Sequence, residues 1–204
     1  MMSTGPRRVG VFGGTFDPIH VGHVAAARRA KEEFSLELVV FVPSGHPWQK
    51  DHYSSAEDRF MMTTLGSAAD QAFAVSRLEL DRRGPTYTLD TMVTLRDFYG
   101  PTTKLFFITG ADAALNLGTW KDVERLAEYC EFIALTRPGF DLDRLERGPG
   151  WPVVTPLEMD PVDVSATDIR QRVVDGVSVE GLVVPDVARY IEERGLYRSM
   201  GTAS

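Results

Sequence analysis

The sequence predicts an α/β protein of 204 residues built around a doubly wound parallel sheet. Short apolar runs alternate along the chain with segments rich in helix formers, which is the order of strand–helix–strand units. The clearest run, at 36–42, is apolar at nearly every position, as in a parallel strand covered on both faces. Helix signals also follow the last expected strand. We therefore expect one domain, with a core at 1–160 and a small helical part at 161–198.

Strands are expected where apolar or β-branched residues end at glycine, proline or serine. These runs are 9–12, 36–42, 73–76, 104–109 and 131–136, with a shorter sixth strand at 153–154. Helices are expected between and after them, at 25–32, 54–65, 87–99, 121–129, 165–176 and 185–194. The first helix should hold Pro18 in its first turn with Asp17 or Thr15 as its cap. The pattern at 54–57 is a capping box.

Composition is ordinary for a globular protein, with 43% hydrophobic and 25% charged residues. The net charge of −7 argues against general binding of nucleic acid or acidic membranes, although a local phosphate site remains compatible with it. Cys130 is the only cysteine, so no intramolecular disulfide forms and a reducing compartment is expected. No apolar run approaches the roughly 18 residues of a membrane span, and 1–8 lacks a signal-peptide core. We expect a cytoplasmic protein.

Residues 13–23 read GGTFDPIHVGH and stand between an expected strand and an expected helix. Glycines at such a turn allow close approach of another group, and a helix N-terminus attracts anions. His20 and His23 share one face of the helix, while Gly22 between them bares the backbone. The stretch predicts a cradle for a nucleotide phosphate.

Two other interpretations of these histidines remain open. All four histidines of the chain fall within its first 52 residues, so His46 and His52 could complete a zinc site. The histidines could also be structural. A zinc site has no use for the glycine turn, the helix start or Gly22, whereas a phosphate site uses all three.

Polar clusters follow four of the expected strands, at the ends where a parallel sheet gathers its ligands. The clusters lie at 13–23, 43–52, 110–112 and 136–139. In open α/β sheets the ligand crevice lies beyond the carboxyl ends of the strands. The clusters therefore predict a single composite site.

Two segments carry a resemblance to a known family. Residues 13–23 match the signature of the nucleotidyltransferase superfamily with the H-x-G-H motif, and 165–170, reading SATDIR, match its second signature, S-x-T-x-x-R. Within the superfamily the chain resembles the bacterial nicotinate-nucleotide adenylyltransferases over nearly its full length. Further matching segments are 87–91, 110–113, Trp120 and 136–139. The resemblance implies a Rossmann-like nucleotidyltransferase fold.

The implied reaction joins ATP and nicotinate mononucleotide to give nicotinate adenine dinucleotide and pyrophosphate, with Mg²⁺, in NAD biosynthesis. The attacking phosphate oxygen is already ionised at neutral pH, so positioning and electrostatics suffice without a nucleophilic side chain. ATP and nicotinate mononucleotide are the expected partners, without nucleic acid or membrane. No residue is assigned as a metal ligand, and a homo-oligomer is left open.

The resemblance also implies roles for individual residues. The phosphate contacts that drive catalysis are expected from His20, His23, Lys50 and Arg170. ATP binding is expected from Gly13, Gly14, Thr15, Phe16, Gly22, Asp112, Arg137, Ser165 and Thr167. The nicotinate nucleotide is expected at Thr86 and Tyr87, whose backbone N–H groups would receive its carboxylate, and at Trp120, which would stack on the pyridine ring.

Several of these roles have plainer alternatives. Trp120 could belong to the core, Lys50 could be a solvated loop charge, and Arg137 could order a turn.

The sequence also departs from the family pattern at two positions. Gln49 stands where relatives commonly carry a histidine, whose role His46 or His52 could take over. Ala166 stands where the second signature often carries a second serine.

Other functions are also compatible with the sequence. The acceptor could instead be nicotinamide mononucleotide or pantetheine phosphate, or the chain could be a non-catalytic nucleotide sensor. The segments at 86–91 and 120 favour nicotinate, and the roles of His46, Trp48 and His52 stay open.

Overall fold

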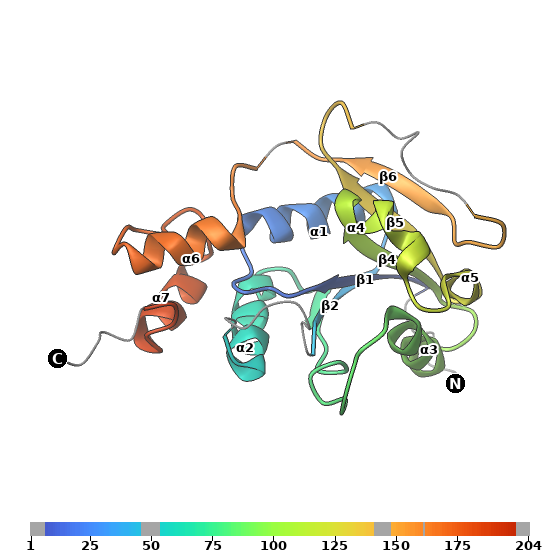
Figure 1. Cartoon of the computed structure of the whole chain (residues 1–204), viewed down its shortest axis with the longest axis horizontal. Coiled ribbons are helices and arrows are strands. Elements are labelled where there is room, and N and C mark those ends of the chain that lie inside the picture. The colour runs from blue at the N-terminus through green and yellow to red at the C-terminus, as the bar shows by residue number, and fades with distance from the viewer. Residues whose placement is uncertain (1–6, 46–53, 141–147, 161, 199–204) are drawn as a thin grey trace.

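The computed structural model describes residues 7–45, 54–140, 148–160 and 162–198. Six strands form one sheet in the order β3-β2-β1-β4-β5-β6, and every neighbouring pair is parallel (Figure 1). Their bounds are β1 (Arg8–Gly14), β2 (Leu38–Pro43), β3 (Phe73–Val75), β4 (Lys104–Gly110), β5 (Cys130–Thr136) and β6 (Val154–Glu158). The chain winds outward from β1 in one direction and from β4 in the other, which confirms the doubly wound fold.

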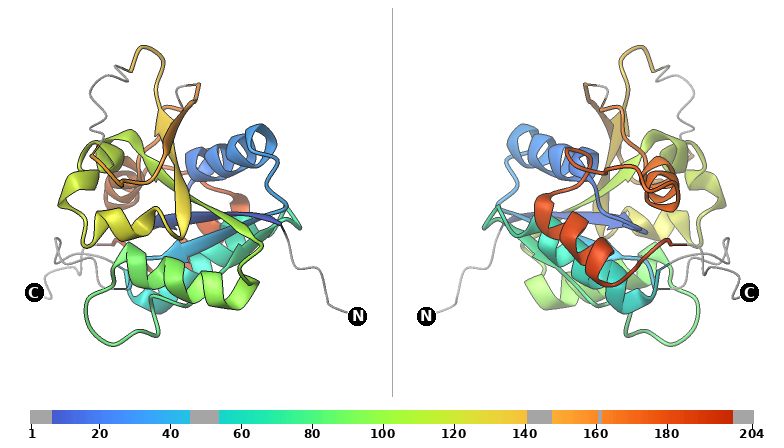
Figure 2. Two further views of the ribbon diagram at one scale, coloured as in Figure 1. Left: turned by 90° about the vertical axis from the view of Figure 1, so that its right-hand side faces the viewer. Right: turned by 90° about the vertical axis from the view of Figure 1, so that its left-hand side faces the viewer.

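Helices cover both faces of this sheet (Figure 2). One face carries α1 (Val21–Glu33) and α2 (Ala56–Ser67), while α6 (Ala166–Val174) and α7 (Pro185–Glu193) lie beyond the end of the sheet and join the same buried cluster (Figure 1). The other face carries α3 (Thr88–Tyr99), the 3₁₀ helix η1 (Leu117–Thr119) and α5 (Val123–Leu126). The short α4 (Ala111–Leu115) follows β4 directly. None of the helices in the described ranges is long and apolar enough to cross a membrane.

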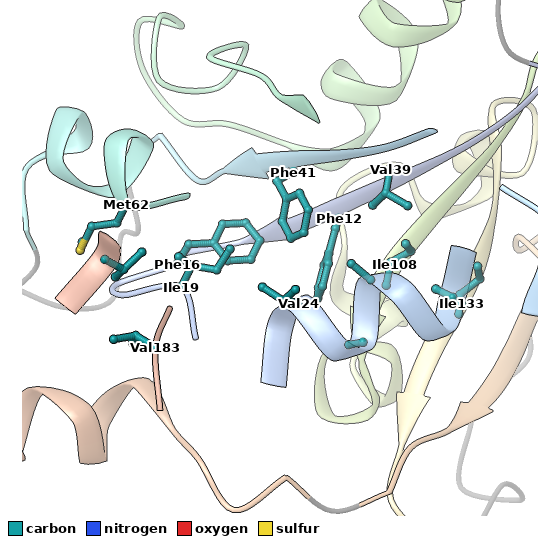
Figure 3. Close-up of a cluster of buried hydrophobic side chains, with 14 of the residues drawn as sticks. Phe12, Phe16, Ile19, Val24, Val39, Phe41, Met62, Ile108, Ile133 and Val183 are labelled. Atoms are coloured by element: carbon teal, nitrogen blue, oxygen red, sulfur yellow. The ribbon is translucent and has the colours of Figure 1, made fainter. Parts of the chain in front are cut away.

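The first of these faces holds the larger part of the core. Figure 3 shows Phe12 of β1 and Phe41 of β2 beside Val24 of α1, with Met62 of α2 in the same cluster. Buried side chains of α6 and α7 belong to this cluster as well. The C-terminal helices thus share the main core, and the boundary at residue 160 stays a prediction.

The centre of the sheet positions the site. β1 pairs with β2 on one side and β4 on the other, and its register sets Phe12 beside Phe41 and Ile108. The chain leaves β1 at Gly14, next to the point where the strand order reverses: β2 and β3 lie on one side of β1, and β4, β5 and β6 lie on the other. Such a switch point is where doubly wound sheets leave a crevice for ligands.

The start of the first helix differs from the expectation. α1 begins at Val21 with His20 as its N-cap, so Pro18 lies outside the helix, and neither Asp17 nor Thr15 caps it. Residues 15–19 form a loop instead, because the side chains of Phe16 and Ile19 turn inward and are buried. The first N–H of α1, from Val21, is satisfied by the carbonyl of Leu182, a distant residue that local pattern does not reveal.

Three other boundaries also differ. α2 is capped by Ser55 rather than Ser54, since the Asp58 amide donates to Ser55 Oγ at 3.1 Å. The helix expected at 121–129 is only the short α5, preceded by η1, because Asp122 takes a left-handed conformation with φ 52°. The sixth strand is longer than expected and begins at Val154.

Candidate active site

A cavity of about 340 Å³ lies where the start of α1 meets the start of α6, beyond the carboxyl end of β1. It brings together the two signature segments, which are far apart in the sequence. Its lining residues are Thr15, Phe16, Asp17, His20, His23, Val164, Ser165, Ala166, Thr167 and Arg170. Figure 2 (right) shows α6 and α7 on the side of the molecule that carries this junction.

The two histidines of the first signature form a stacked pair. Their ring centroids are 3.7 Å apart and their planes differ by 27°. The backbone N–H of His20 donates to Nδ1 of His23 at 3.2 Å. An accepting nitrogen carries no proton, so the neutral ring of His23 holds its proton on Nε2. His23 is therefore a hydrogen-bond donor at Nε2.

Burial keeps both rings uncharged at neutral pH. It lowers the pKa of His20 from 6.5 to about 4. The pKa of His23 is held well below its usual value, first by burial and then by the neighbouring His20. The pair can therefore offer N–H groups to an anion without carrying a positive charge of its own.

Phe16 anchors the loop that leads to these histidines. Its ring makes edge-to-face contacts with Phe12 and Phe41, each at a centroid distance of 5.6 Å. It also meets the ring of His23 at 5.1 Å. Phe16 holds a left-handed backbone conformation, φ 52°, which aromatic residues rarely adopt, so tertiary packing sets the path of this loop.

The glycines that open the signature lie in β1 and do not line the cavity. A Cβ on Gly13 would come within 2.7 Å of the Phe107 ring, and one on Gly14 within 2.8 Å of the Phe16 ring. Both glycines thus make room for aromatic side chains. Their assignment to ATP binding stays a prediction.

Gly22 has a packing role that its sequence context did not reveal. A Cβ here would lie 3.1 Å from Nδ1 of His20 and 3.1 Å from a methyl group of Val164. Gly22 therefore lets the segment before α6 approach the histidine pair.

Arg59 of α2, which the sequence analysis did not select, ties the ends of β1 and β2 together. Its side chain is buried, and its guanidinium donates to the carbonyls of Thr15 at 3.2 Å, Ser44 at 2.7 Å and Gly45 at 3.2 Å. The signal available in the sequence was that Arg59 is the single cation of the helix expected at 54–65 and lies on its apolar face.

Asp17 is a second functional candidate that the sequence analysis missed. Its carboxylate is buried and accepts hydrogen bonds from the Ser54 amide at 3.1 Å and the Tyr197 hydroxyl at 2.6 Å. Its backbone carbonyl accepts from Nη1 of Arg170 at 2.7 Å. Asp17 thus connects the first signature to the second.

The start of α6 presents the second signature to the cavity. Ser165 caps the helix, accepting from the Asp168 amide at 3.0 Å. Nη2 of Arg170 donates to Oγ1 of Thr167 at 3.1 Å. Arg170 is therefore held from two sides, and the positive end of the helix dipole lies next to it.

The residues expected to bind the nicotinate nucleotide lie around the start of α3. Tyr87 is the N-cap of α3, and its exposed ring lies 4.2 Å from Nζ of Lys121. Thr86 packs close to Gly45 after β2. Trp120, the neighbour of Lys121, is half-buried.

Trp120 also has contacts of an ordinary core residue. Its ring meets Phe107 and Phe132 edge-on, each at 5.7 Å between centroids. Both a core role and a stacking role remain compatible with this position.

The other predicted site residues do not line the cavity or fall outside the described ranges. Asp112 in α4 and Arg137 after β5 are exposed at the carboxyl edge of the sheet. Lys50, with the neighbouring loop residues His46, Trp48, Gln49 and His52, lies outside the residues that the structure describes. Within those described residues, no group of three or more His, Cys, Asp or Glu side chains gathers that could hold a metal ion.

Comparison with known proteins identifies the family. The family model "Cytidylyltransferase-like" matches residues 11–172. A relative from Moorella thermoacetica, named "Probable nicotinate-nucleotide adenylyltransferase", is 49% identical, covering 96% of this chain and 94% of its own length. One of the same name from Saccharopolyspora erythraea is 48% identical over 94% of this chain and 90% of its own length.

Solved structures match the fold. The Plasmodium falciparum nicotinic acid mononucleotide adenylyltransferase complexed with NaAD aligns with a TM-score of 0.77 at 18% identity, covering 94% of this chain and 97% of its own. The same protein complexed with APC aligns with a TM-score of 0.74 at 17% identity, with the same coverage. By its full-length relatives and its matching family model, the chain belongs to the nicotinate-nucleotide adenylyltransferases of the cytidylyltransferase-like family.

Proposed function

We propose that this enzyme transfers the adenylyl group of ATP to nicotinate mononucleotide, giving nicotinate adenine dinucleotide and pyrophosphate in NAD biosynthesis. The observation that carries the proposal is the cavity shared by the H-x-G-H helix start and the Ser165–Arg170 helix start. Relatives at 48–49% identity carry the name of this activity.

The transfer needs one substitution at phosphorus. An oxygen of the nicotinate mononucleotide phosphate attacks the α-phosphorus of ATP, and the bond to the bridging oxygen of the β-phosphate breaks. The attacking oxygen is already ionised, so no side chain has to remove a proton. The protein must hold two anionic groups in line and stabilise the charge that develops on pyrophosphate.

The cavity supplies donors of suitable kinds for that charge. His23 offers Nε2–H without a positive charge, because its Nδ1 accepts the His20 amide. Arg170 offers its remaining N–H groups from a guanidinium held by Asp17 and Thr167. Preorganised donors of this kind stabilise a transition state more than groups that must first reorient.

The described lining of the cavity leaves a Mg²⁺ ion that enters with ATP to be held by the phosphates and by water rather than by a protein carboxylate. Asp17 is the one acidic residue among the described residues lining the cavity, and both of its carboxylate oxygens already accept hydrogen bonds. Mg²⁺ commonly keeps several waters and binds substrate phosphates, so few protein ligands are required. When bound, it would neutralise charge on the phosphates.

We place the nicotinate ring near Thr86, Tyr87 and Trp120. Lys121 sets a positive charge beside Tyr87, which favours an anionic carboxylate over a neutral amide. A carboxylate only accepts hydrogen bonds, so backbone N–H groups can donate to both of its oxygens. The NH₂ group of an amide would face those N–H groups donor to donor, without a hydrogen bond.

The test is to incubate the enzyme with ATP, Mg²⁺ and one acceptor: nicotinate mononucleotide, nicotinamide mononucleotide or pantetheine phosphate. Pyrophosphate is measured and the product is identified by mass spectrometry, with the His20→Ala variant as control for contaminating activity. We expect nicotinate adenine dinucleotide as the main product. Preference for another acceptor would overturn the assigned substrate, and ATP binding without pyrophosphate from any acceptor would indicate a sensor.

A further inference from the structure

The carboxylate of Asp17 lies at the cavity and joins three distant parts of the chain. It is 1% exposed and accepts from the amide of Ser54, where the chain enters α2, and from the hydroxyl of Tyr197 after α7. The carbonyl of the same residue holds Arg170 of α6 at 2.7 Å. Asp17 therefore links the start of α2 and the segment after α7 to the peptide whose carbonyl holds Arg170.

Tyr197 reaches Asp17 through an unusual backbone conformation. Its φ is 63°, in the left-handed region that bulky side chains avoid. The preceding residue, Leu196, is fixed by its amide, which donates to the carbonyl of Ile191 at 3.0 Å. The phenol points inward, with its oxygen 2.6 Å from Asp17 and 3.7 Å from the sulfur of Met62. Strained backbone that persists at a ligand site commonly serves the geometry of that site.

The C-terminal helix does not depend on this contact for its attachment. The hydroxyl of Tyr190 in α7 donates to Oδ1 of the buried Asp58 carboxylate in α2 at 2.8 Å. Nε of Arg194, directly after α7, donates to the same Oδ1 at 3.3 Å. Apolar residues of α7, Val187 and Ile191, pack into the main core. Among the described residues, two phenol–carboxylate hydrogen bonds are present, and of these the one at Asp17 involves a cavity-lining residue while the one at Asp58 does not.

We propose that Tyr197 is a positioning residue for adenylyl transfer, acting through Asp17 on Arg170. Its hydroxyl fixes the Asp17 carboxylate against Ser54, which in turn fixes the carbonyl that holds the Arg170 guanidinium toward the ATP phosphates. This role rests on the proposed function.

Removing the Tyr197 hydroxyl changes the hydrogen bonds that the Asp17 carboxylate accepts. In Tyr197→Phe the buried Asp17 carboxylate keeps the Ser54 amide and loses the Tyr197 hydroxyl, which leaves a buried carboxylate with too few hydrogen-bond donors. We expect the carboxylate to move in order to regain a donor. The attached peptide moves with it, so Arg170 loses its alignment with the leaving pyrophosphate. Misplacement of about 1 Å at a reacting centre costs up to about 10²-fold in rate.

The experiment compares Tyr197→Phe with the matched control Tyr190→Phe. Each variant removes one phenol hydroxyl from a buried carboxylate, and the melting temperature is recorded for both. We expect Tyr197→Phe to lower kcat/KM for ATP by about 10-fold or more, with KM for nicotinate mononucleotide unchanged. In Tyr190→Phe the Asp58 carboxylate keeps the Ser55 hydroxyl and Arg194 as partners, so we expect a smaller drop in melting temperature and kcat/KM for ATP within about 2-fold of the wild type. Equal losses of activity in the two variants would show a merely structural role and overturn the proposal.

A double-variant cycle tests the route through Arg170. If Tyr197 acts by orienting Arg170, then Tyr197→Phe added to Arg170→Ala should change kcat/KM by less than about 2-fold. Full additivity of the two effects would refute that route.

Binding of a non-hydrolysable ATP analogue, measured by calorimetry, separates this proposal from the proposed function. If the wild type fails to release pyrophosphate, the proposed function fails. The positioning role still predicts weaker analogue binding in Tyr197→Phe than in Tyr190→Phe, and equal binding contradicts it.

Discussion

The stacked histidine pair should make the folded enzyme lose stability as the pH falls below neutral. In the folded state the pKa of His20 is about 4, whereas in the unfolded chain it takes its usual value near 6.5. Between these two pH values the His20 ring is protonated in the unfolded chain and neutral in the folded chain. The free energy of unfolding therefore decreases as pH falls from about 6.5 to about 4. Above pH 6.5 the full stability is present.

The size of this loss follows from the difference between the two pKa values. That difference, from 6.5 to about 4, corresponds to a loss on the order of 3 kcal/mol, since each step of one in pKa is about 1.4 kcal/mol. The lowered pKa of His23 acts in the same direction.

The assay is urea denaturation between pH 4 and pH 7.5 for the wild type and His20→Gln. Carboxylates titrate in both proteins, so the difference between their stability curves isolates the histidine. We expect the wild type to lose on the order of 3 kcal/mol more than the variant over this range. Parallel curves, or an NMR titration of the His20 ring with its midpoint near 6.5, would refute the half-buried, neutral pair.

Three further predictions concern single side chains. His23→Ala should lower kcat by at least ~10²-fold in the pyrophosphate assay, because a preorganised donor is lost, and near-normal turnover would reject its phosphate contact. Trp120→Ala should raise KM for nicotinate mononucleotide by about 2- to 12-fold, the loss of one stacking contact of about 0.5–1.5 kcal/mol, with KM for ATP unchanged. Lower thermal stability with both KM values intact would instead identify a core residue. Arg59→Met should reduce the free energy of unfolding by about 3 kcal/mol or more in urea titrations, since three carbonyls lose a donor at about 1–3 kcal/mol each, and a loss below about 1 kcal/mol would contradict that role.

The strands and the overall winding could be predicted from sequence because their signals are local. Runs such as 36–42 are apolar at successive positions, and the observed β2 (Leu38–Pro43) falls on that run. The meeting of both signature segments at one cavity agrees with what the family resemblance implied, since both segments were expected to contact the ATP phosphates. Of the four polar clusters after strand ends, only the one at 13–23 contributes described residues to the lining of that cavity.

The start of α1 could not be predicted because distant residues decide it. Pro18 and Asp17 carry good local signals for a first turn and a cap, yet the helix starts at Val21, where the Leu182 carbonyl accepts its first N–H. The Asp17 carboxylate is taken by Ser54 and Tyr197 instead.

Buried polar networks were missed for the same reason. The local sequence does not show the partners of Arg59, Asp17 or Tyr197, and only the fold brings each of them to its partners. A pattern that repeats along one helix or strand cannot report a contact between residues 17 and 197.

The most direct test of the ATP site is a crystal structure of the enzyme with a non-hydrolysable ATP analogue and Mg²⁺. The account predicts phosphate oxygens within hydrogen-bond distance of the His20 and His23 rings and of the Arg170 guanidinium, inside the cavity between α1 and α6. An analogue bound with its phosphates elsewhere, leaving those three side chains without contact, would contradict it.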